Sequence, residues 1–177
     1  MEKNISDFVN LRLGDLKRNR ISHISLNVGI LCNQQCNHCH LEAGPNKKND
    51  VMGREIIGKL KEFIKFAGPE SLEITGGAPE LNKNIVELIE EIRPLVKRIS
   101  MRTNLTAMLD NDFSKLSTFL YDRKINLVAS LPCYTKDGVD GQRGNGVFKK
   151  SIDILRKLNS IGFGMDIGVP ITLVYNP

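Results

Sequence analysis

The chain has 177 residues, of which 41% are hydrophobic and 25% are charged, as in an ordinary folded domain with a core of its own. No apolar run approaches the roughly 18 residues of a membrane span, and the charged N-terminus lacks the apolar stretch of a signal peptide. The sequence therefore predicts a cytoplasmic protein and excludes a membrane partner.

The formal net charge is +5, from 25 Lys and Arg residues against 20 Asp and Glu residues. The basic residues are scattered along the chain, and the pair Lys47-Lys48 lies in a polar stretch with few aromatic residues nearby. This pattern is typical of a solvated basic surface, so a nucleic-acid partner is not favoured.

The first 21 residues hold a weakly amphipathic stretch, which we interpret as an N-terminal capping segment over residues 1–21. A core domain is predicted over residues 22–177. Its predicted strands cover residues 24–30, 72–75, 98–103, 125–131 and 165–175. Apolar residues at helical spacing predict helices over residues 52–64, 85–92, 113–120 and 148–158. In the last strand, Gly168 and Pro170 predict a bulge, a break or an edge position.

The predicted strands alternate with helices, and three of them begin at the evenly spaced positions Ser71, Arg98 and Ile125. A βα unit of this length needs a right-handed crossover and a parallel sheet. The predicted fold class is therefore α/β, as a curved or partial barrel. In such barrels the active site lies at the C-terminal ends of the strands.

Three cysteines, Cys32, Cys36 and Cys39, follow the first predicted strand within a few residues. Thiolates at this spacing can bind one [4Fe-4S] cluster and leave its fourth iron without a protein ligand. Zinc held by the three cysteines and His40 is a reasonable alternative. The segment from Cys36 to His40 also fits c-type haem attachment, but that interpretation needs an exported protein and leaves Cys32 unexplained.

Polar and glycine residues follow the next strands. The stretch from Thr75 to Glu80, here called the glycine loop, contains two glycines that let the backbone approach a ligand closely, although a plain turn is the alternative. Residues 132–146 are too glycine-rich for a helix or strand and are predicted to be a binding loop. In that loop Arg143 could bind a carboxylate bidentately, and Cys133 supplies a thiol that is either reactive or inert.

The spacing CxxxCxxC after a first strand resembles the radical S-adenosylmethionine (SAM) superfamily. The stretches CNQQCNHCHLEAGP, ITGGAPEL, RTNLT and ASLPCY resemble the arsenosugar-biosynthesis family within it, over roughly residues 24–177. The resemblance implies a (β/α)6-type barrel. With five predicted strands, the chain is expected to be truncated after the fifth, without a C-terminal region that helps to close the substrate pocket.

The resemblance also implies roles for particular residues. Cys32, Cys36 and Cys39 would bind the cluster, and Cys133 is the candidate catalytic residue, as a soft ligand for arsenic. The residues implied to contact SAM are His38, Gly76, Gly77, Ala78, Pro79, Glu80, Thr103, Asn104, Ser130 and Arg143. His38 stands where the family has an aromatic residue beside the adenine. Alanine and proline separate the glycines from Glu80, unlike in the family's GGE-like motif, so the glycines carry over better than the glutamate.

The implied reaction is reductive cleavage of SAM. Its amino and carboxylate groups chelate the open iron, and an electron from a donor such as flavodoxin or ferredoxin gives methionine and a 5′-deoxyadenosyl radical. In the arsenosugar family this group is transferred to a small molecule, a dimethylated trivalent arsenic compound, by a deoxyadenosyl transferase. The alternatives are hydrogen abstraction from a peptide or RNA substrate, and a non-catalytic module with structural zinc.

Overall fold

The computed structural model describes residues 20–37, 39–110 and 112–175, so the predicted capping segment lies almost wholly outside the described residues. Five strands form one sheet in the order β1-β2-β3-β4-β5, and every neighbouring pair is parallel. They are β1 (His23–Asn27), β2 (Ser71–Thr75), β3 (Arg98–Thr103), β4 (Asn126–Ser130) and β5 (Ile171–Val174). The strand order follows the chain, as a repeated βα crossover requires.

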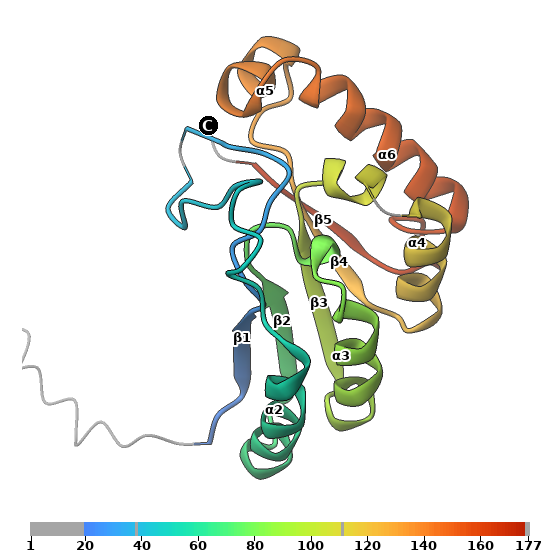
Figure 1. The fold of residues 1–177 in the computed structure, drawn as a ribbon. Helices are drawn as coiled ribbons and strands as arrows, with labels where there is room; N and C mark the ends of the chain where they lie inside the picture. The colour runs from blue at the N-terminus through green and yellow to red at the C-terminus, as the bar shows by residue number, and fades with distance from the viewer. Residues whose placement is uncertain (1–19, 38, 111, 176–177) are drawn as a thin grey trace, which may run out of the picture.

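The helices cover one face of this curved sheet (Figure 1). They are α2 (Arg54–Ala67), α3 (Ile85–Ile92), α4 (Phe113–Asp122), α5 (Lys136–Arg143) and α6 (Val147–Ile161), with 3-10 turns η1 (Pro79–Leu81), η2 (Arg93–Leu95) and η3 (Thr106–Asp110). Alternate strand side chains, such as Leu72, Ile74 and Met101, are fully buried in the core between the sheet and the helices. Because strand side chains alternate between faces, the polar residues between them point to the opposite face.

The structure confirms the predicted α/β class with a parallel sheet, but the last strand was predicted too long. Residues 165–170 form turns instead of extending the strand: Gly168 N–H donates to the Met165 carbonyl at 2.9 Å, and Gly164 N–H donates to the Val169 carbonyl at 2.8 Å. The strand starts after Pro170, which has no N–H to offer a neighbouring strand. The predicted break and edge position are therefore correct, since β5 pairs only with β4 in the described sheet.

The prediction that residues 132–146 form a loop without a helix was wrong, because α5 lies within them. The Thr135 hydroxyl accepts a hydrogen bond from Gly138 N–H at 3.3 Å and caps the helix, and Val139 is fully buried as its apolar anchor. Gly144, at φ 107°, ends the helix. One good cap and one buried anchor outweigh the low helix propensity of the glycines.

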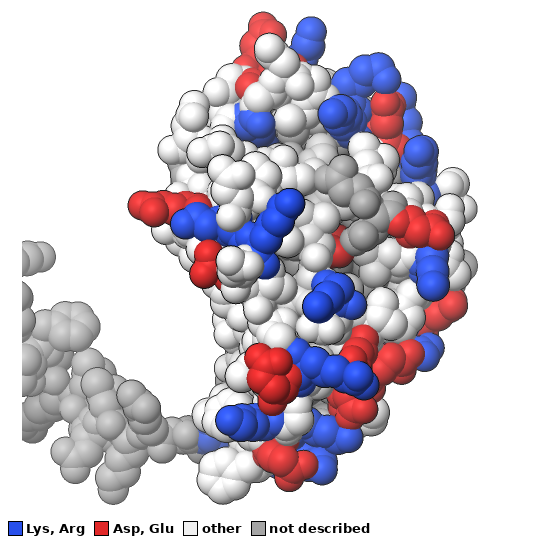
Figure 2. Space-filling model, viewed as in Figure 1, with Lys and Arg blue, Asp and Glu red and all other residues white. Residues whose placement is uncertain are grey.

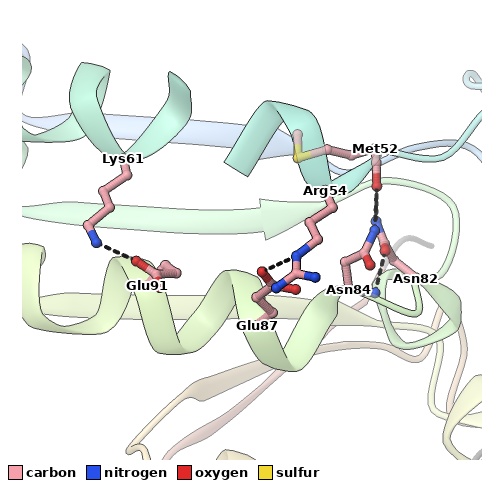
Figure 3. A network of polar contacts seen from close by, with 7 residues as sticks. All are labelled: Met52, Arg54, Lys61, Asn82, Asn84, Glu87 and Glu91. Atoms are coloured by element: carbon pink, nitrogen blue, oxygen red, sulfur yellow. Dashed lines mark hydrogen bonds and ion pairs between the residues drawn. The ribbon is translucent and has the colours of Figure 1, made fainter. Parts of the chain in front are cut away.

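Polar contacts tie α2 to α3 (Figure 3). Arg54 Nε lies 2.6 Å from Glu87 Oε1, and Lys61 Nζ lies 2.5 Å from Glu91 Oε2. Exposed pairs of this kind stabilise a fold only slightly. They do explain why basic and acidic side chains lie beside one another over these helices in Figure 2. No helix in the described part of the chain is long and apolar enough to cross a membrane.

Candidate functional site

The cysteine loop, residues 28–52, leaves the end of β1 and returns to its own start. Ile30 N–H donates to the Asp50 carbonyl at 2.8 Å, and Met52 N–H donates to the Val28 carbonyl at 3.0 Å. Further along, Gly44 N–H donates to the Ile30 carbonyl at 3.2 Å. These backbone bonds form a closed stem, so the three cysteines are carried on a loop whose two ends are fixed to each other.

The glycine loop lies directly against this stem. Gly77 N–H donates to the Gly29 carbonyl at 2.9 Å, and Ala78 N–H donates to the Leu31 carbonyl at 2.8 Å. A Cβ on Gly77 would lie 2.4 Å from the Leu31 carbonyl oxygen, and one on Gly76 would lie 2.4 Å from that of Gly29. The close backbone approach that the glycines allow is thus made to the cysteine loop, and contact with a ligand remains a prediction.

A buried side chain just after the glycine loop holds the two ends of the cysteine loop together. Asn82, just after η1, donates from Nδ2 to the carbonyls of Val28 at 3.2 Å and Met52 at 3.1 Å, one at each end of the cysteine loop. Its Oδ1 accepts from Asn84 N–H at 2.9 Å, so its orientation is fixed (Figure 3). Asn82 had not been singled out from the sequence, where a lone asparagine after a glycine loop resembles an ordinary turn residue.

A cavity of about 480 Å³ opens at the C-terminal ends of the strands, within the usual range for small-molecule sites. It brings together the cysteine loop, the glycine loop, the ends of β3 and β4, and α5. The residues from the sequence analysis that line it are Cys32, Cys36, Cys39, His40, Thr75, Gly76, Gly77, Thr103, Asn104, Ser130 and Arg143.

The three thiols that line the cavity each contact a polar group. Cys32 Sγ accepts from Asn104 Nδ2 and from Gln34 N–H, both at 3.4 Å. Cys39 Sγ accepts from Ala43 N–H at 3.4 Å. Cys36 Sγ lies 3.5 Å from the Gln34 side-chain oxygen. N–H donors to sulfur stabilise cluster-bound thiolates, so the surroundings of Cys32 and Cys39 suit such ligands, whereas at Cys36 the thiol itself donates to the Gln34 oxygen.

Burial raises the pKa of Cys32 and of Cys36, and the Arg143 guanidinium opposes that rise at Cys36. Metal binding needs the thiolate form, which a bound cation stabilises. Among the described residues, which include His40, no three cysteine, histidine or acidic side chains are arranged around a single metal ion.

Arg143 and Ser130 meet at the side of the cavity opposite the glycine loop. Arg143 Nη1 donates to the Ser130 carbonyl at 2.9 Å, and burial lowers the pKa of the guanidinium while Cys36 and Cys32 act against that shift. No described residue bonds Arg143 Nε, which is buried. The guanidinium therefore keeps a donor for a ligand beside the thiols.

Asp140 fixes the turn that follows Arg143. Its carboxylate accepts from Phe148 N–H at 2.8 Å and from Gly146 N–H at 3.0 Å, at the start of α6. These two bonds hold the pKa of Asp140 below its usual value of 3.8. The carboxylate thereby joins α5 to α6 and sets the direction in which α5 presents Arg143.

Five residues named in the sequence analysis do not line this cavity or lie outside the described residues. Ala78 and Pro79 lie just past the glycines, and His38 is not described. Glu80 is fully buried and lines a separate groove beside α3 and α4, where burial raises its pKa to about 7 against the effect of a hydrogen bond with Thr103. Cys133 packs against the first turn of α5, and its thiol lies 3.2 Å from Thr135 Oγ1, which lowers the pKa of Cys133.

The cavity also has lining residues that the sequence analysis missed. They are Ser25, Asn27, Gln34, Leu41, Glu73 and Arg102. Most come from strands, at alternate positions opposite the buried apolar residues. The sequence signal for these strand residues was the alternation of polar and apolar residues. A strand with one face in solvent shows the same alternation, so it does not identify a cavity.

A comparison with protein-family models matches residues 26–174 to the radical SAM superfamily. Among curated proteins, a probable GTP 3′,8-cyclase of Methanocaldococcus jannaschii is 33% identical over 97 residues, which is 54% of this chain and 32% of that protein. The antilisterial bacteriocin subtilosin biosynthesis protein AlbA of Bacillus subtilis is 26% identical over 150 residues, 84% of this chain and 33% of that protein. The chain thus spans about a third of the length of these relatives.

Solved structures show the same fold. Native anSMEcpe with bound AdoMet and Cp18Cys peptide aligns with a TM-score of 0.67 and 19% identity, over 88% of this chain and 42% of that one. Streptococcus suis SuiB bound to S-adenosylmethionine aligns with a TM-score of 0.66 and 17% identity, over 81% of this chain and 32% of that one. These likenesses confirm the predicted partial barrel.

Proposed function

Since the chain belongs to the radical SAM superfamily, whose members are enzymes, we propose that it forms the part of an enzyme that cleaves SAM at a [4Fe-4S] cluster. One observation carries the proposal. Cys32, Cys36 and Cys39, the cysteines of the motif, line a single cavity together with polar groups at the strand ends. The cavity is also large enough for a small-molecule cofactor beside them.

In this proposal Cys32, Cys36 and Cys39 would hold the [4Fe-4S] cluster and leave one iron without a protein ligand. The chemistry that such a cluster supplies is one-electron reduction of SAM, which gives methionine and a 5′-deoxyadenosyl radical. The N–H groups of Gln34 and Ala43 and the amide of Asn104 donate to the thiolates and stabilise their negative charge. A flavodoxin or ferredoxin would donate the electron.

The protein orients SAM with groups on both sides of the cavity. Arg143 binds the methionine carboxylate, because its guanidinium lies beside the thiols and keeps a free buried donor. Gly76 and Gly77 present backbone without a side chain on the facing side, and Thr103 and Ser130 offer polar contacts. Support is weaker for Ala78, Pro79, Glu80 and His38, which stay predictions from the resemblance.

The acceptor of the radical is a separate proposal. The resemblance to the arsenosugar-biosynthesis family indicates a dimethylated trivalent arsenic compound, to which the deoxyadenosyl group is transferred. Cys133 is the candidate ligand for it, since a thiol is a soft ligand that suits arsenic; its Sγ lies against the first turn of α5, next to the cavity and not among its lining residues. A peptide substrate is the second candidate, favoured by the Cp18Cys peptide that the structurally similar anSMEcpe binds.

The experiment is anaerobic reconstitution with iron and sulfide, metal counting, and a dithionite-driven assay for 5′-deoxyadenosine. We expect about four irons per chain and 5′-deoxyadenosine from SAM alone. Adding a trivalent dimethylarsenic compound should give an arsenic adduct. Formation of 5′-deoxyadenosine without an adduct would keep the SAM chemistry and remove the arsenic acceptor. One zinc per chain and no cluster would contradict the proposal.

Four single variants separate the cysteines. Cys32→Ala, Cys36→Ala and Cys39→Ala should each reduce 5′-deoxyadenosine to background, because each removes one of three cluster ligands. Cys133→Ala is the matched control, since it removes a thiol outside the cavity, and should leave SAM cleavage unchanged. Retained cleavage in any of the first three variants would contradict the ligand assignment.

A further inference from the structure

One part of the cavity is lined by side chains of β1, β2 and β3. We call Ser25, Asn27, Glu73, Thr75 and Arg102 the cavity floor. In the sheet register Ser25 lies opposite Glu73, and Asn27 lies opposite Thr75. Two residues along a strand span about 7 Å, so the floor reaches that far from the strand ends toward the middle of the sheet.

The floor is polar throughout, which is uncommon for a small-molecule site. Each of its five side chains carries a hydroxyl, an amide or a charge. In the whole cavity, Leu41 is the one aliphatic side chain among the described lining residues. A ligand with polar oxygens would find donors on such a floor.

Arg102 is the strongest donor on the floor. Its Nε donates to Glu73 Oε2 at 2.9 Å, and the Glu73 side chain is only 17% exposed, against 46% for Arg102. That bond uses one edge of the guanidinium and fixes its plane. In the described part of the chain, no residue bonds the two terminal nitrogens of Arg102, which are the fork that binds carboxylates and phosphates bidentately.

The charges around the cavity also favour an anion there. Two arginines line it, Arg102 on the floor and Arg143 beside the thiols, and Glu73 is the one described acidic lining residue. In the proposed function Arg143 binds the carboxylate of SAM. Arg102 is then the cation left for a second ligand, and the enclosing walls strengthen its attraction for a negative group.

We propose that Arg102, oriented by Glu73, binds an oxyanion of the substrate, a carboxylate or a phosphate. The proposal rests on the proposed function, which makes this cavity the place where substrate meets SAM. It names a chemical group that an uncharged dimethylarsenic compound lacks, so of the two acceptors proposed above it favours the peptide, whose carboxylates are such groups, over the arsenical. Ser25 and Thr75 would bind further oxygens of the same ligand.

The same strand supplies a matched control. Arg98 lies four positions before Arg102 and therefore on the same face of β3. It also faces a glutamate, with its guanidinium 4.0 Å from Glu70 Oε2, and its side chain is 65% exposed. Arg98 does not line the cavity. Replacing either arginine by glutamine thus removes one positive charge from an ion pair of β3. Only Arg102→Gln removes a positive charge from the cavity floor.

The test is isothermal titration calorimetry of the full chain, without a cluster, against inorganic phosphate and against succinate. We expect binding of at least one of the two anions, with a site whose affinity is about tenfold or more weaker in Arg102→Gln and unchanged in Arg98→Gln; Arg143→Gln identifies any second site at that arginine. Glu73→Gln keeps an acceptor for Arg102 Nε but removes the competing charge, and should tighten binding about threefold or more. The tighter of the two anions identifies the source of the oxyanion.

Several results would overturn the proposal. They are no binding of either anion, equal binding by wild type and Arg102→Gln, or equal losses in Arg102→Gln and Arg98→Gln, which would indicate general surface charge. Thermal unfolding of each variant shows whether the fold is kept, and if Arg102→Gln does not fold, the response of Glu73→Gln decides. Because this assay needs neither cluster nor SAM, anion binding without 5′-deoxyadenosine formation would contradict the proposed function and leave the anion site standing.

Discussion

The two sides of the cavity are built in different ways. On one side, which we call the cysteine rim, the cysteine loop and the glycine loop are joined mainly by backbone hydrogen bonds, and Gly77 leaves no room for a Cβ. At the arginine rim, α5 is held to the sheet and to α6 by side chains, through the bonds of Arg143 and Asp140, and one backbone bond from Asn37 N–H to the Gln142 carbonyl joins it to the cysteine loop. The cysteine rim should therefore be sensitive to an added Cβ, and the arginine rim to the loss of a side-chain group.

Each rim also has a carboxyl group on one of its loops or helices, and the pKa values of the two groups are shifted in opposite directions. Burial raises the pKa of Glu80, on the cysteine rim, to about 7. Hydrogen bonds from the backbone lower the pKa of Asp140, on the arginine rim. A buried carboxyl is disfavoured in its charged form, and a carboxylate that accepts N–H bonds is favoured in it. The contribution of Glu80 to stability should therefore be lost as the pH rises through about 7, and that of Asp140 as the pH falls below 3.8.

Gly77→Ala should have the largest effect on the comparison. The new Cβ would lie 2.4 Å from the Leu31 carbonyl oxygen and 2.9 Å from the Ile30 carbonyl carbon, so backbone must move. We expect a loss of roughly 3 kcal/mol in the free energy of unfolding, together with less iron per chain, because Cys32 follows Leu31 directly. Urea denaturation and iron counting measure both.

The control for that substitution is Gly58→Ala in α2. No atom lies within 4 Å of the added Cβ, so the change should stabilise the helix by about 0.5–1 kcal/mol and leave the iron content unchanged. If Gly77→Ala were as stable as wild type and bound the same iron, the cysteine rim would not depend on close backbone contact.

Glu80→Gln tests the buried carboxyl. The folded-state pKa of Glu80 is raised from 4.5 to about 7, so the neutral acid stabilises the fold at low pH and this contribution is lost as the pH rises through 7. Wild type should lose about 2 kcal/mol between pH 5 and pH 7.5, and Glu80→Gln should lose much less. Denaturation at several pH values measures the difference, and parallel pH profiles would contradict the burial of a neutral Glu80.

Asn82→Ala removes the side chain that holds both ends of the cysteine loop. It leaves the Val28 and Met52 carbonyls without one donor each, and should lower the free energy of unfolding by about 1–2 kcal/mol. Asn84→Ala is the control. The Asn84 side chain donates only to the Met52 carbonyl, at 3.4 Å, so this variant should lose less free energy of unfolding than Asn82→Ala. Equal effects of the two variants in urea denaturation would remove Asn82 from this role.

Asp140→Asn should have the smallest effect. The folded-state pKa of Asp140 is depressed, so its contribution is present above the usual 3.8 and is lost as the pH falls through the lower folded-state value. Thermal unfolding should show that the variant is less stable than wild type at neutral pH and that the difference shrinks in acid. Asp137→Asn, in the exposed first turn of α5, is the control and should track wild type. A difference that does not depend on pH would contradict the two carboxylate bonds.

The sequence predicted what depends on periodicity and on short spacing. Strands β2 to β4 and helices α3, α4 and α6 repeat apolar residues at clear intervals. Three cysteines within eight residues of one loop can be expected to line the same cavity. The helix α5 was not predicted because its glycines have low helix propensity, and the Thr135 cap and the buried Val139 that stabilise it are single residues with no repeating pattern. The cavity floor was missed because Glu73 and Arg102 occupy strand positions that look the same whether they face solvent or a cavity. The burial of Glu80 depends on packing between η1 and η3, which no local pattern reports.

The most direct test of the account is electron paramagnetic resonance of the reconstituted, dithionite-reduced chain, with and without SAM, on a sample whose iron is counted. We expect about four irons per chain and a cluster signal that changes when SAM is added, because in the proposed function SAM would bind the iron that Cys32, Cys36 and Cys39 would leave open. A cluster whose signal is the same with and without SAM, or a sample that holds zinc in place of iron, would contradict the account.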